Sequence, residues 1–286
     1  GSKMLELRTI SYRVGDKALL DKVSLEIHPG EVVAIVGANG AGKTTLTNIL
    51  SGKKTPQSGE VILDGDPIES LPANSLARRR AVLPQFSNLS FAFTVFEVVL
   101  LGRTPHQTSA SVDADICLEA MRVTGVAHLA SREYPTLSGG EQQRVHLARA
   151  LAQIWHPNGD GDRYLFLDEP TASLDLAHQH HVLHIARDCA KLGLGVMAVL
   201  HDLNLAAEHA DRIAIMRQGT IAAVGSPDDV LTSENIEAAF DISVMVTQHP
   251  HAACPLVVAV PEEDIDLRLA REEQALHETI QQLLNE

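Results

Sequence analysis

A glycine-rich stretch near the start of the chain has the residue types and spacing of a loop that binds phosphate. It follows the apolar run Val32–Val36 and reads GANGAGKTT over residues 37–45. Glycines let successive backbone N–H groups point at phosphate oxygens, and we expect Lys43 to contact the β- and γ-phosphates and Thr44 to bind Mg²⁺. A glycine turn with a solvated lysine is the simpler alternative, but the strand before and the helix after this stretch disfavour it. The predicted nucleotide-binding residues of the loop are Gly37, Ala38, Asn39, Gly40, Ala41, Gly42, Lys43, Thr44 and Thr45.

Two adjacent carboxylates, Asp168 and Glu169, end a second apolar run. Residues 158–169 read NGDGDRYLFLDE, which is close to the spacing of a helix–loop–helix calcium loop. A calcium loop needs glycine at its sixth place, where this sequence has Arg163, and a helix on its far side. The sequence instead favours a strand, Tyr164–Leu167, that delivers Asp168 to Mg²⁺ and Glu169 to the water that attacks the γ-phosphate. Residues 158–162 are then a polar turn that leads into the strand.

A second stretch is also suited to phosphate. Residues 137–141, LSGGE, come directly before QQRVHLARALA, which has the pattern of a helix. The first N–H groups of a helix, together with the Ser138 hydroxyl, can hold an anion. The chain has no internal repeat, so it offers one copy of each phosphate-binding stretch.

A layered α/β fold is needed to position these groups. Strands separated by helices predict a mainly parallel sheet that is covered on both faces. Beyond residue 261 the pattern predicts an amphipathic helix with an acidic start. The other expected elements are strands at 5–11, 18–27, 31–36, 60–63 and 196–200, a helix from the phosphate loop through residue 51, mostly helical chain at 88–157, a helix at 177–192 and a mixed region at 226–261. The residues after LSGGE that should face a core are Val145, Ala148, Leu151, Ala152 and Trp155.

Composition and charge narrow the possible functions. The 286 residues carry a formal charge of −14, which argues against a general nucleic-acid binder because such a protein needs a basic face. The three cysteines are far apart and form no CxxC pair, so we expect no disulfide framework and a reducing compartment. We find no apolar run of membrane-spanning length.

The segment LSGGE followed by QQRV strongly resembles the signature of ATP-binding-cassette (ABC) ATPases, and the other motifs stand in that family's order from about Met4 to Pro261. The resemblance implies an α/β fold with a P-loop NTPase (RecA-like) core, an antiparallel β subdomain and a helical subdomain that carries the signature. The implied division is 4–87 for the ATP-binding core with the N-terminal β subdomain and phosphate loop, 88–157 for the helical subdomain, 158–225 for the second part of the core, 226–261 for a C-terminal extension and 262–286 for an acidic, amphipathic tail.

The same resemblance assigns the remaining site residues. Tyr12 matches the aromatic residue that stacks on adenine, with a structural tyrosine in a small sheet as the alternative. Gln85 matches a glutamine that contacts Mg²⁺ and senses the membrane partner, and His201 matches a histidine that contacts the γ-phosphate. Residues 173–175 resemble the loop that crosses between two subunits. The implied catalytic residues are Glu169, His201, Lys43 and Gln85, the Mg²⁺ ligands are Thr44, Gln85 and Asp168, and the further ATP contacts are Tyr12, Ser138, Gly139, Gly140, Glu141 and Asp175.

The resemblance also implies partners. In this family the phosphate loop of one subunit and the LSGG segment of another enclose one ATP, so we expect a head-to-tail homodimer with two ATP molecules. The expected further partners are two copies of a membrane permease and, indirectly, a periplasmic haem-binding protein, with this chain on the cytoplasmic side of the bacterial inner membrane and no nucleic acid bound. The alternatives are a soluble ABC protein of translation or DNA repair, which would have tandem cassettes or coiled-coil insertions, and a nucleotide kinase, which LSGGE, Gln85 and His201 disfavour.

Two segments indicate the subfamily. FTVFEVVLLGRTPH at 93–106 and HDLNLAAEHADRI at 201–213 look like the ATPases of bacterial importers for iron chelates, haem and vitamin B12. The long connection from the signature helix to the acidic strand, and QHPHAACP at 248–255, favour haemin over a ferric siderophore or cobalamin. No residue of the chain chemically specifies haem.

Several histidines remain outside these motifs. His178, His180, His181 and His184 could share one face of a helix. His249, His251 and Cys254 are further residues of types that bind metals. A solvated helix and an ordinary loop are the simpler interpretation, and the sequence favours them.

Overall fold

The centre of the computed structural model, which describes residues 3–85, 89, 91–155, 161–261 and 265–284, is a six-stranded sheet in the order β10-β9-β3-β8-β7-β6. Five strands are parallel, and only the edge strand β10 runs antiparallel to its neighbour among the described residues. Their apolar runs are continuous because helices cover both faces. The strands are β3 (Val32–Gly37), β6 (Arg80–Leu83), β7 (Tyr164–Asp168), β8 (Gly195–Val199), β9 (Arg212–Arg217) and β10 (Thr220–Gly225).

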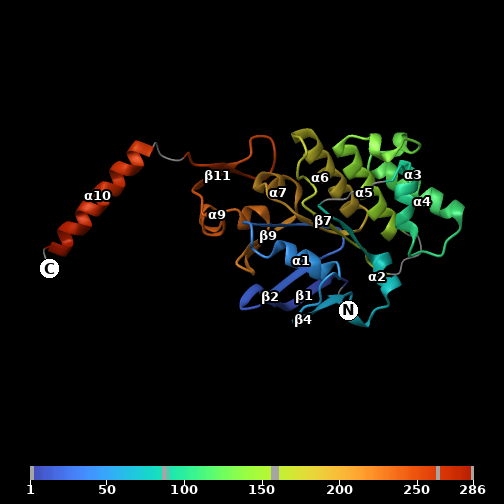
Figure 1. Cartoon of the computed structure of the whole chain (residues 1–286), viewed down its shortest axis with the longest axis horizontal. Helices are drawn as coiled ribbons and strands as arrows, with labels where there is room; N and C mark the ends of the chain where they lie inside the picture. The colour runs from blue at the N-terminus through green and yellow to red at the C-terminus, as the bar shows by residue number, and fades with distance from the viewer. Residues whose placement is uncertain (1–2, 86–88, 90, 156–160, 262–264, 285–286) are drawn as a thin grey trace.

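A second, antiparallel sheet in the order β2-β1-β4-β5 lies against one side of the core (Figure 1). Helix α1 (Lys43–Leu50) packs between the two sheets, with Leu46 and Leu50 fully buried against Leu7 and Ile35. Side chains of β3 alternate between the two faces of the central sheet, so Val33 and Ile35 belong to this cluster. The strands are β1 (Leu5–Val14), β2 (Lys17–Ile27), β4 (Ser58–Leu63) and β5 (Asp66–Pro67).

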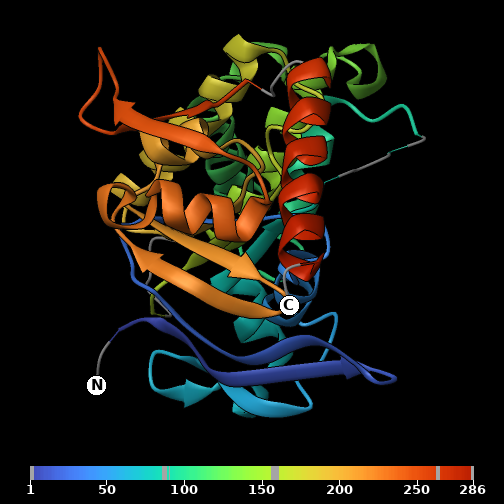
Figure 2. The same cartoon turned by 90° about the vertical axis from the view of Figure 1, so that its left-hand side faces the viewer.

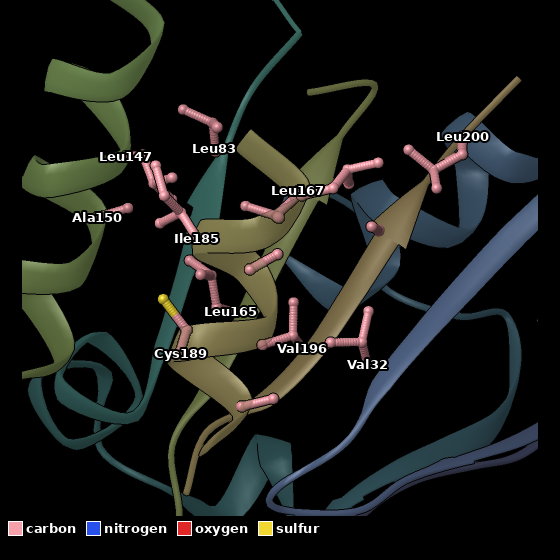
Figure 3. Close-up of a cluster of buried hydrophobic side chains, with 14 of the residues drawn as sticks. Val32, Leu83, Leu147, Ala150, Leu165, Leu167, Ile185, Cys189, Val196 and Leu200 are labelled. Carbon is pink, nitrogen blue, oxygen red and sulfur yellow. The ribbon is translucent and has the colours of Figure 1, made fainter. Parts of the chain in front are cut away.

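The opposite face of the central sheet is covered by α5 (Gly139–Ile154) and α6 (Leu176–Lys191). Figure 3 shows side chains from β3, β6, β7, β8 and both helices in one apolar cluster, including Val32, Leu147 and Ile185. Four of the five residues expected to face a core after LSGGE are buried, and Trp155, at the end of α5, packs against the same cluster while partly buried.

Helices α3, α4 and α5 form a helical subdomain on one side of the core (Figure 1). Thr94 and Ser109 cap the starts of α3 and α4 through their hydroxyls, which satisfies N–H groups that have no partner within the helix. The remaining elements of this half are α2 (Ala73–Arg79), α3 (Val95–Leu100), α4 (Ala110–Val123) and the short 3₁₀ turns η1 (Ile68–Ser70), η2 (Leu101–Arg103), η3 (Ala127–Leu129) and η4 (Tyr134–Thr136).

The C-terminal extension returns to the core through a hairpin. The side chain of Asn204 on α7 holds that hairpin by two hydrogen bonds to Val257, 3.0 Å to its carbonyl and 2.7 Å from its N–H. The expected tail helix is present as α10, which extends away from the rest of the chain in Figure 1 and is seen in front of it in Figure 2. Its residues Leu269, Leu276, Leu283 and Leu284 are exposed. The elements are α7 (Leu203–His209), α8 (Pro227–Val230), α9 (Ser233–Phe240), β11 (Val244–Gln248), β12 (Pro255–Ala259) and α10 (Ile265–Leu284).

The layered α/β fold predicted from the sequence is confirmed, and no described helix is long and apolar enough to cross a membrane. Strands β6, β9 and β10 were not among the predicted elements. The division of the chain at residues 87, 157, 225 and 261 stays a prediction. The polar turn proposed at 158–162 lies mostly outside the described residues, because the structure resumes at Gly161.

Candidate functional site

The phosphate loop runs from the end of β3 to the start of α1, as the sequence predicts. Gly42 is the residue before the helix and has φ +105°, a conformation that side-chain-bearing residues rarely adopt. A Cβ atom there would lie 2.7 Å from the Leu19 carbonyl oxygen, and one at Gly37 would lie 2.6 Å from the Met216 carbonyl oxygen. Both glycines are therefore required by close backbone contacts.

Lys43 is buried, and its ammonium group donates a hydrogen bond to the Gly37 carbonyl at the opposite end of the loop. Burial lowers the pKa of Lys43, while the carboxylates of Glu169 and Asp168 act in the opposite direction. The ammonium thus lies inside the loop and within the field of both acidic residues. A cavity of about 150 Å³ beside it is lined by Lys17, Leu19, Asn39, Gly40, Gly42, Lys43, Thr44, Thr45 and Glu169.

Three of the other predicted site residues follow neighbouring parallel strands. Asp168 is the last residue of β7, and Gln85 and His201 each stand two residues beyond the ends of β6 and β8. The carboxyl ends of parallel strands meet at one edge of a sheet, which is where such folds bind ligands. The order β3-β8-β7-β6 therefore brings all three to the edge that carries the phosphate loop.

Glu169 and His201 are in direct contact. Nε2 of His201 lies 2.7 Å from Oε1 of Glu169, and the glutamate side chain is mostly buried while the histidine is half exposed. Glu169 also has φ +50°, an unusual conformation for a residue with a side chain that tends to persist where the surroundings impose it. Burial raises the pKa of the adjacent Asp168, and the negative charge of Glu169 raises it further.

The signature segment forms the start of α5. The Ser138 hydroxyl accepts from the Glu141 N–H at 3.2 Å, and the Glu141 carboxylate accepts from the Ser138 N–H at 3.0 Å. This reciprocal capping fixes the first turn, and Ser138 and Gly139 are exposed. Among the described residues, none of LSGGE lines the cavity beside Lys43. The two predicted phosphate-binding ends are therefore not joined in one cavity of one chain.

Two contacts tie the start of α5 to the residues after the acidic strand. The side-chain amide of Gln143 donates to the Pro170 carbonyl at 3.3 Å. Gly140 packs so closely on His178 that a Cβ atom would lie 2.6 Å from its ring, and His178 Nδ1 is 2.7 Å from Asp175. Asp175 thus caps α6 beside the signature turn.

Tyr12 lies in β1, partly buried against the cluster around α1, with the Lys54 ammonium 5.0 Å from its ring centre. It does not line the cavity beside Lys43, so its role toward adenine stays a prediction. Lys17 and Leu19 do line that cavity. Sequence reasoning missed them because β2 has no motif, and only the pairing of sheets brings it beside the phosphate loop.

The four histidines of α6 do not share one face, which contradicts the possibility raised from their spacing. His178 lies against Gly140, and His181 lies beside Gly125, where its Nε2 would be 3.6 Å from a Cβ atom. His180 and His184 instead lie against His209 of α7, with ring centres 5.2 and 5.0 Å away. Successive helical residues are about 100° apart, which places His178 and His180 on different sides of the helix.

The chain was compared with known proteins. The family model described as ABC transporter matches residues 20–172. The chain is 54% identical to a protein of Gloeobacter violaceus named Hemin import ATP-binding protein HmuV, over 89% of this chain and 94% of that protein. Proteins of the same name from Myxococcus xanthus and Pseudomonas aeruginosa are 49% and 45% identical, over 89% and 90% of this chain and 96% and 100% of their own lengths.

Solved structures give the same fold. A transporter assigned to the metal-chelate type of ABC transporters, in an inward-facing conformation, matches with a TM-score of 0.77 and 26% identity over 91% of this chain and 99% of that one. A bacterial ABC transporter cassette described as dimeric, MJ0796, matches with a TM-score of 0.65 and 27% identity over 78% of this chain and 98% of that one.

Proposed function

This chain belongs to the ABC transporter family of ATP-binding proteins, and on that premise we propose that it is the ATP-hydrolysing subunit of a bacterial importer of haemin. The observation that carries hydrolysis is the contact between Glu169 and His201 at a cavity formed by the phosphate loop. A carboxylate held beside a triphosphate is suited to take a proton from water.

The roles of the residues follow from their positions. The N–H groups of the phosphate loop and the Lys43 ammonium hold the charge of the β- and γ-phosphates. Glu169 accepts a proton from water as the water oxygen attacks the γ-phosphorus and the bond to the bridging oxygen of ADP breaks. His201 holds the Glu169 carboxylate in place, and its half-exposed ring would contact the γ-phosphate.

The residues at this edge also suit Mg²⁺. Thr44, Gln85 and Asp168 offer hydroxyl, amide and carboxylate oxygens, which are the ligand types that Mg²⁺ prefers. Asp168 and Glu169 are adjacent carboxylates, and the charge of Glu169 raises the pKa of Asp168; a cation at this place would relieve that repulsion. When bound, Mg²⁺ supplies neutralisation of charge on the phosphates.

The working unit we propose is a head-to-tail dimer. The exposed Ser138–Gly139 turn of one copy would close over the ATP held by the phosphate loop of the other, because it does not reach the cavity of its own chain. Tyr12 would stack on adenine, and Asp175 would lie at the subunit boundary. A membrane permease, in two copies, would carry the substrate and hold the dimer at the cytoplasmic face of the inner membrane.

Haemin is the substrate that the relatives favour. The proteins that are 45–54% identical over about nine tenths of the chain are named for haemin import. The residues of the site do not contact the transported molecule in this proposal, so the chemistry of the site leaves a ferric siderophore or vitamin B12 as alternatives.

Reconstitution tests both levels of the proposal. The chain would be combined in liposomes with the permease of the same organism's haemin importer, and ATP hydrolysis and uptake would be measured with haem, siderophore or cobalamin on their binding proteins. We expect haem with its binding protein to stimulate both, and Glu169→Gln to abolish both. Stimulation by cobalamin or a siderophore alone would overturn the choice of haemin, and full hydrolysis by the Glu169→Gln subunit would overturn the site.

A further inference from the structure

A compact group of side chains outside the nucleotide site joins α6, α7 and the β11–β12 hairpin. Nδ1 of His180 lies 2.9 Å from Nε2 of His209 and 3.6 Å from Oε2 of Glu208. One ligand atom from each of these three residues lies within 4.8 Å of the others. Two imidazole nitrogens and a carboxylate oxygen therefore converge on one point.

The spacing suits a small transition-metal ion. With bonds of about 2.0–2.1 Å to nitrogen and oxygen, two ligands of a tetrahedral zinc site are roughly 3.3 Å apart. The observed separations of 2.9 and 3.6 Å bracket that value. The side chains of His180 and Glu208 are 32% and 25% exposed, so an ion can enter and water can fill a remaining position.

One residue holds the carboxylate in orientation. Nδ1 of His249 accepts a hydrogen bond from the His251 N–H at 3.0 Å, which leaves the proton of a neutral ring on Nε2. That Nε2 lies 3.2 Å from Oε1 of Glu208. The bond fixes one carboxylate oxygen and leaves Oε2 facing His180. Partners of this kind commonly orient the ligands of metal sites.

The buried member of the group supports a ligand role over a chance contact. His209 is 5% exposed, and its Nδ1 is buried without a hydrogen-bond partner among the described residues. Within the part of the chain that the structure describes, its ring makes one hydrogen bond, between Nε2 and Nδ1 of His180. A metal ion would bind Nε2 in place of the contact with His180, and the proton of the neutral ring would then lie on Nδ1.

We propose that His180, Glu208 and His209 form a binding site for one divalent transition-metal ion of the zinc class, with His249 positioning Glu208. Two nitrogen donors favour zinc, copper, nickel or cobalt over Mg²⁺ or Ca²⁺, which prefer oxygen. Haem iron offers protein ligands two axial positions at most, so three donors that converge on one side do not suit it. The ion would fasten the C-terminal hairpin to the core helices.

The test uses the full-length chain without an affinity tag, stripped with chelator. After dialysis against Zn²⁺ we expect one zinc per chain, and with Co²⁺ the visible absorption of a tetrahedral site. His180→Ala and Glu208→Gln should abolish both signals, and His249→Ala should weaken zinc binding about 10- to 100-fold. Zinc should raise the melting temperature of the unaltered chain but not that of His180→Ala or Glu208→Gln.

Two controls separate this site from others. His128→Ala removes an exposed histidine far from the group in sequence, and Asp168→Asn alters the Mg²⁺ site; both should keep one zinc per chain. His180 and Glu208 are partly exposed, so both variants should fold, and their far-ultraviolet circular dichroism should match that of the unaltered chain. Zinc binding that survives His180→Ala and Glu208→Gln in folded protein would overturn the proposal. So would a chain that binds no zinc, or one whose histidines bind haemin in place of zinc.

Discussion

Nε2 of His201 lies 2.7 Å from Oε1 of Glu169, although the two residues are 32 positions apart in the chain. The contact arises because β7 and β8 are neighbours in the sheet and both residues follow the ends of these strands. The sheet thus brings the proposed base and the group that would orient it to one place. The His201 imidazole fixes the Glu169 carboxylate, and the backbone of Glu169 adopts an unusual conformation.

Replacing Glu169 with glutamine should stop hydrolysis but preserve ATP binding. The amide keeps the size of the side chain but cannot accept a proton, and loss of general-base catalysis typically costs about 10²- to 10⁴-fold in rate. Phosphate release and the elution volume with ATP would be measured, with a trapped dimer expected. Glu119→Gln, an exposed glutamate on α4, is the control and should hydrolyse normally. Normal hydrolysis by Glu169→Gln would show that another group is the base.

Lys43→Ala should weaken ATP binding itself. Hydrogen bonds to charged groups contribute about 1.5–3 kcal/mol, so the dissociation constant should rise roughly 10- to 100-fold. Titration calorimetry with ATP gives the value directly. The control Lys191→Ala, which changes an exposed lysine at the end of α6, should leave the dissociation constant unaltered. An unaltered affinity in Lys43→Ala would remove the phosphate-loop assignment.

Gly42→Ala should destabilise the loop by two separate effects. The residue has φ +105°, and a Cβ atom would lie 2.7 Å from the Leu19 carbonyl oxygen. Gly193 provides a matched control, since it has φ +98° and nothing within 4 Å of a Cβ atom. Backbone strain alone costs about 1–3 kcal/mol, so urea unfolding should show a larger loss for Gly42→Ala than for Gly193→Ala. Equal losses would mean that the Leu19 contact relaxes freely.

Acid should destabilise the chain partly through His146. Burial lowers the pKa of His146 to about 4, with Arg149 adding to the effect, and its Nε2 is 2.6 Å from the Tyr134 hydroxyl. The unfolded chain takes up this proton near pH 6.5 and the folded chain does not, so stability is full above that pH and falls as pH drops toward 4. The free energy of unfolding should be about 2 kcal/mol lower at pH 5 than at neutral pH because of this one group.

The variant His146→Gln tests this assignment, since glutamine can accept from Tyr134 but does not titrate. The free energy of unfolding, measured in urea between neutral pH and about pH 5, should fall less steeply for His146→Gln than for the unaltered chain. His128→Gln changes an exposed histidine and should retain the original slope. If His146→Gln retains it as well, His146 is not the group responsible.

The position of the proposed catalytic residues at one edge of the sheet was largely predictable from sequence because these residues lie in local motifs. The phosphate loop, Asp168 and Glu169 each follow an apolar run directly, so strand ends locate them. Lys17 and the group around His209 were not predictable, because strand pairing and helix packing bring together residues that are distant in sequence. The sequence left a common face for the four α6 histidines possible, but the helix places His178 beside Gly140 and His180 beside His209, on different sides.

The hydrogen bond from Gln143 to the Pro170 carbonyl has a consequence for cooperativity. In the proposed dimer, Glu169 serves the ATP bound by its own chain, while the first turn of α5 covers the ATP of the other copy. Gln143 directly follows that turn and Pro170 directly follows Glu169, so a shift at one nucleotide would be passed to the other. ATP hydrolysis should then depend on ATP concentration with a Hill coefficient above one, and Gln143→Ala should lower it.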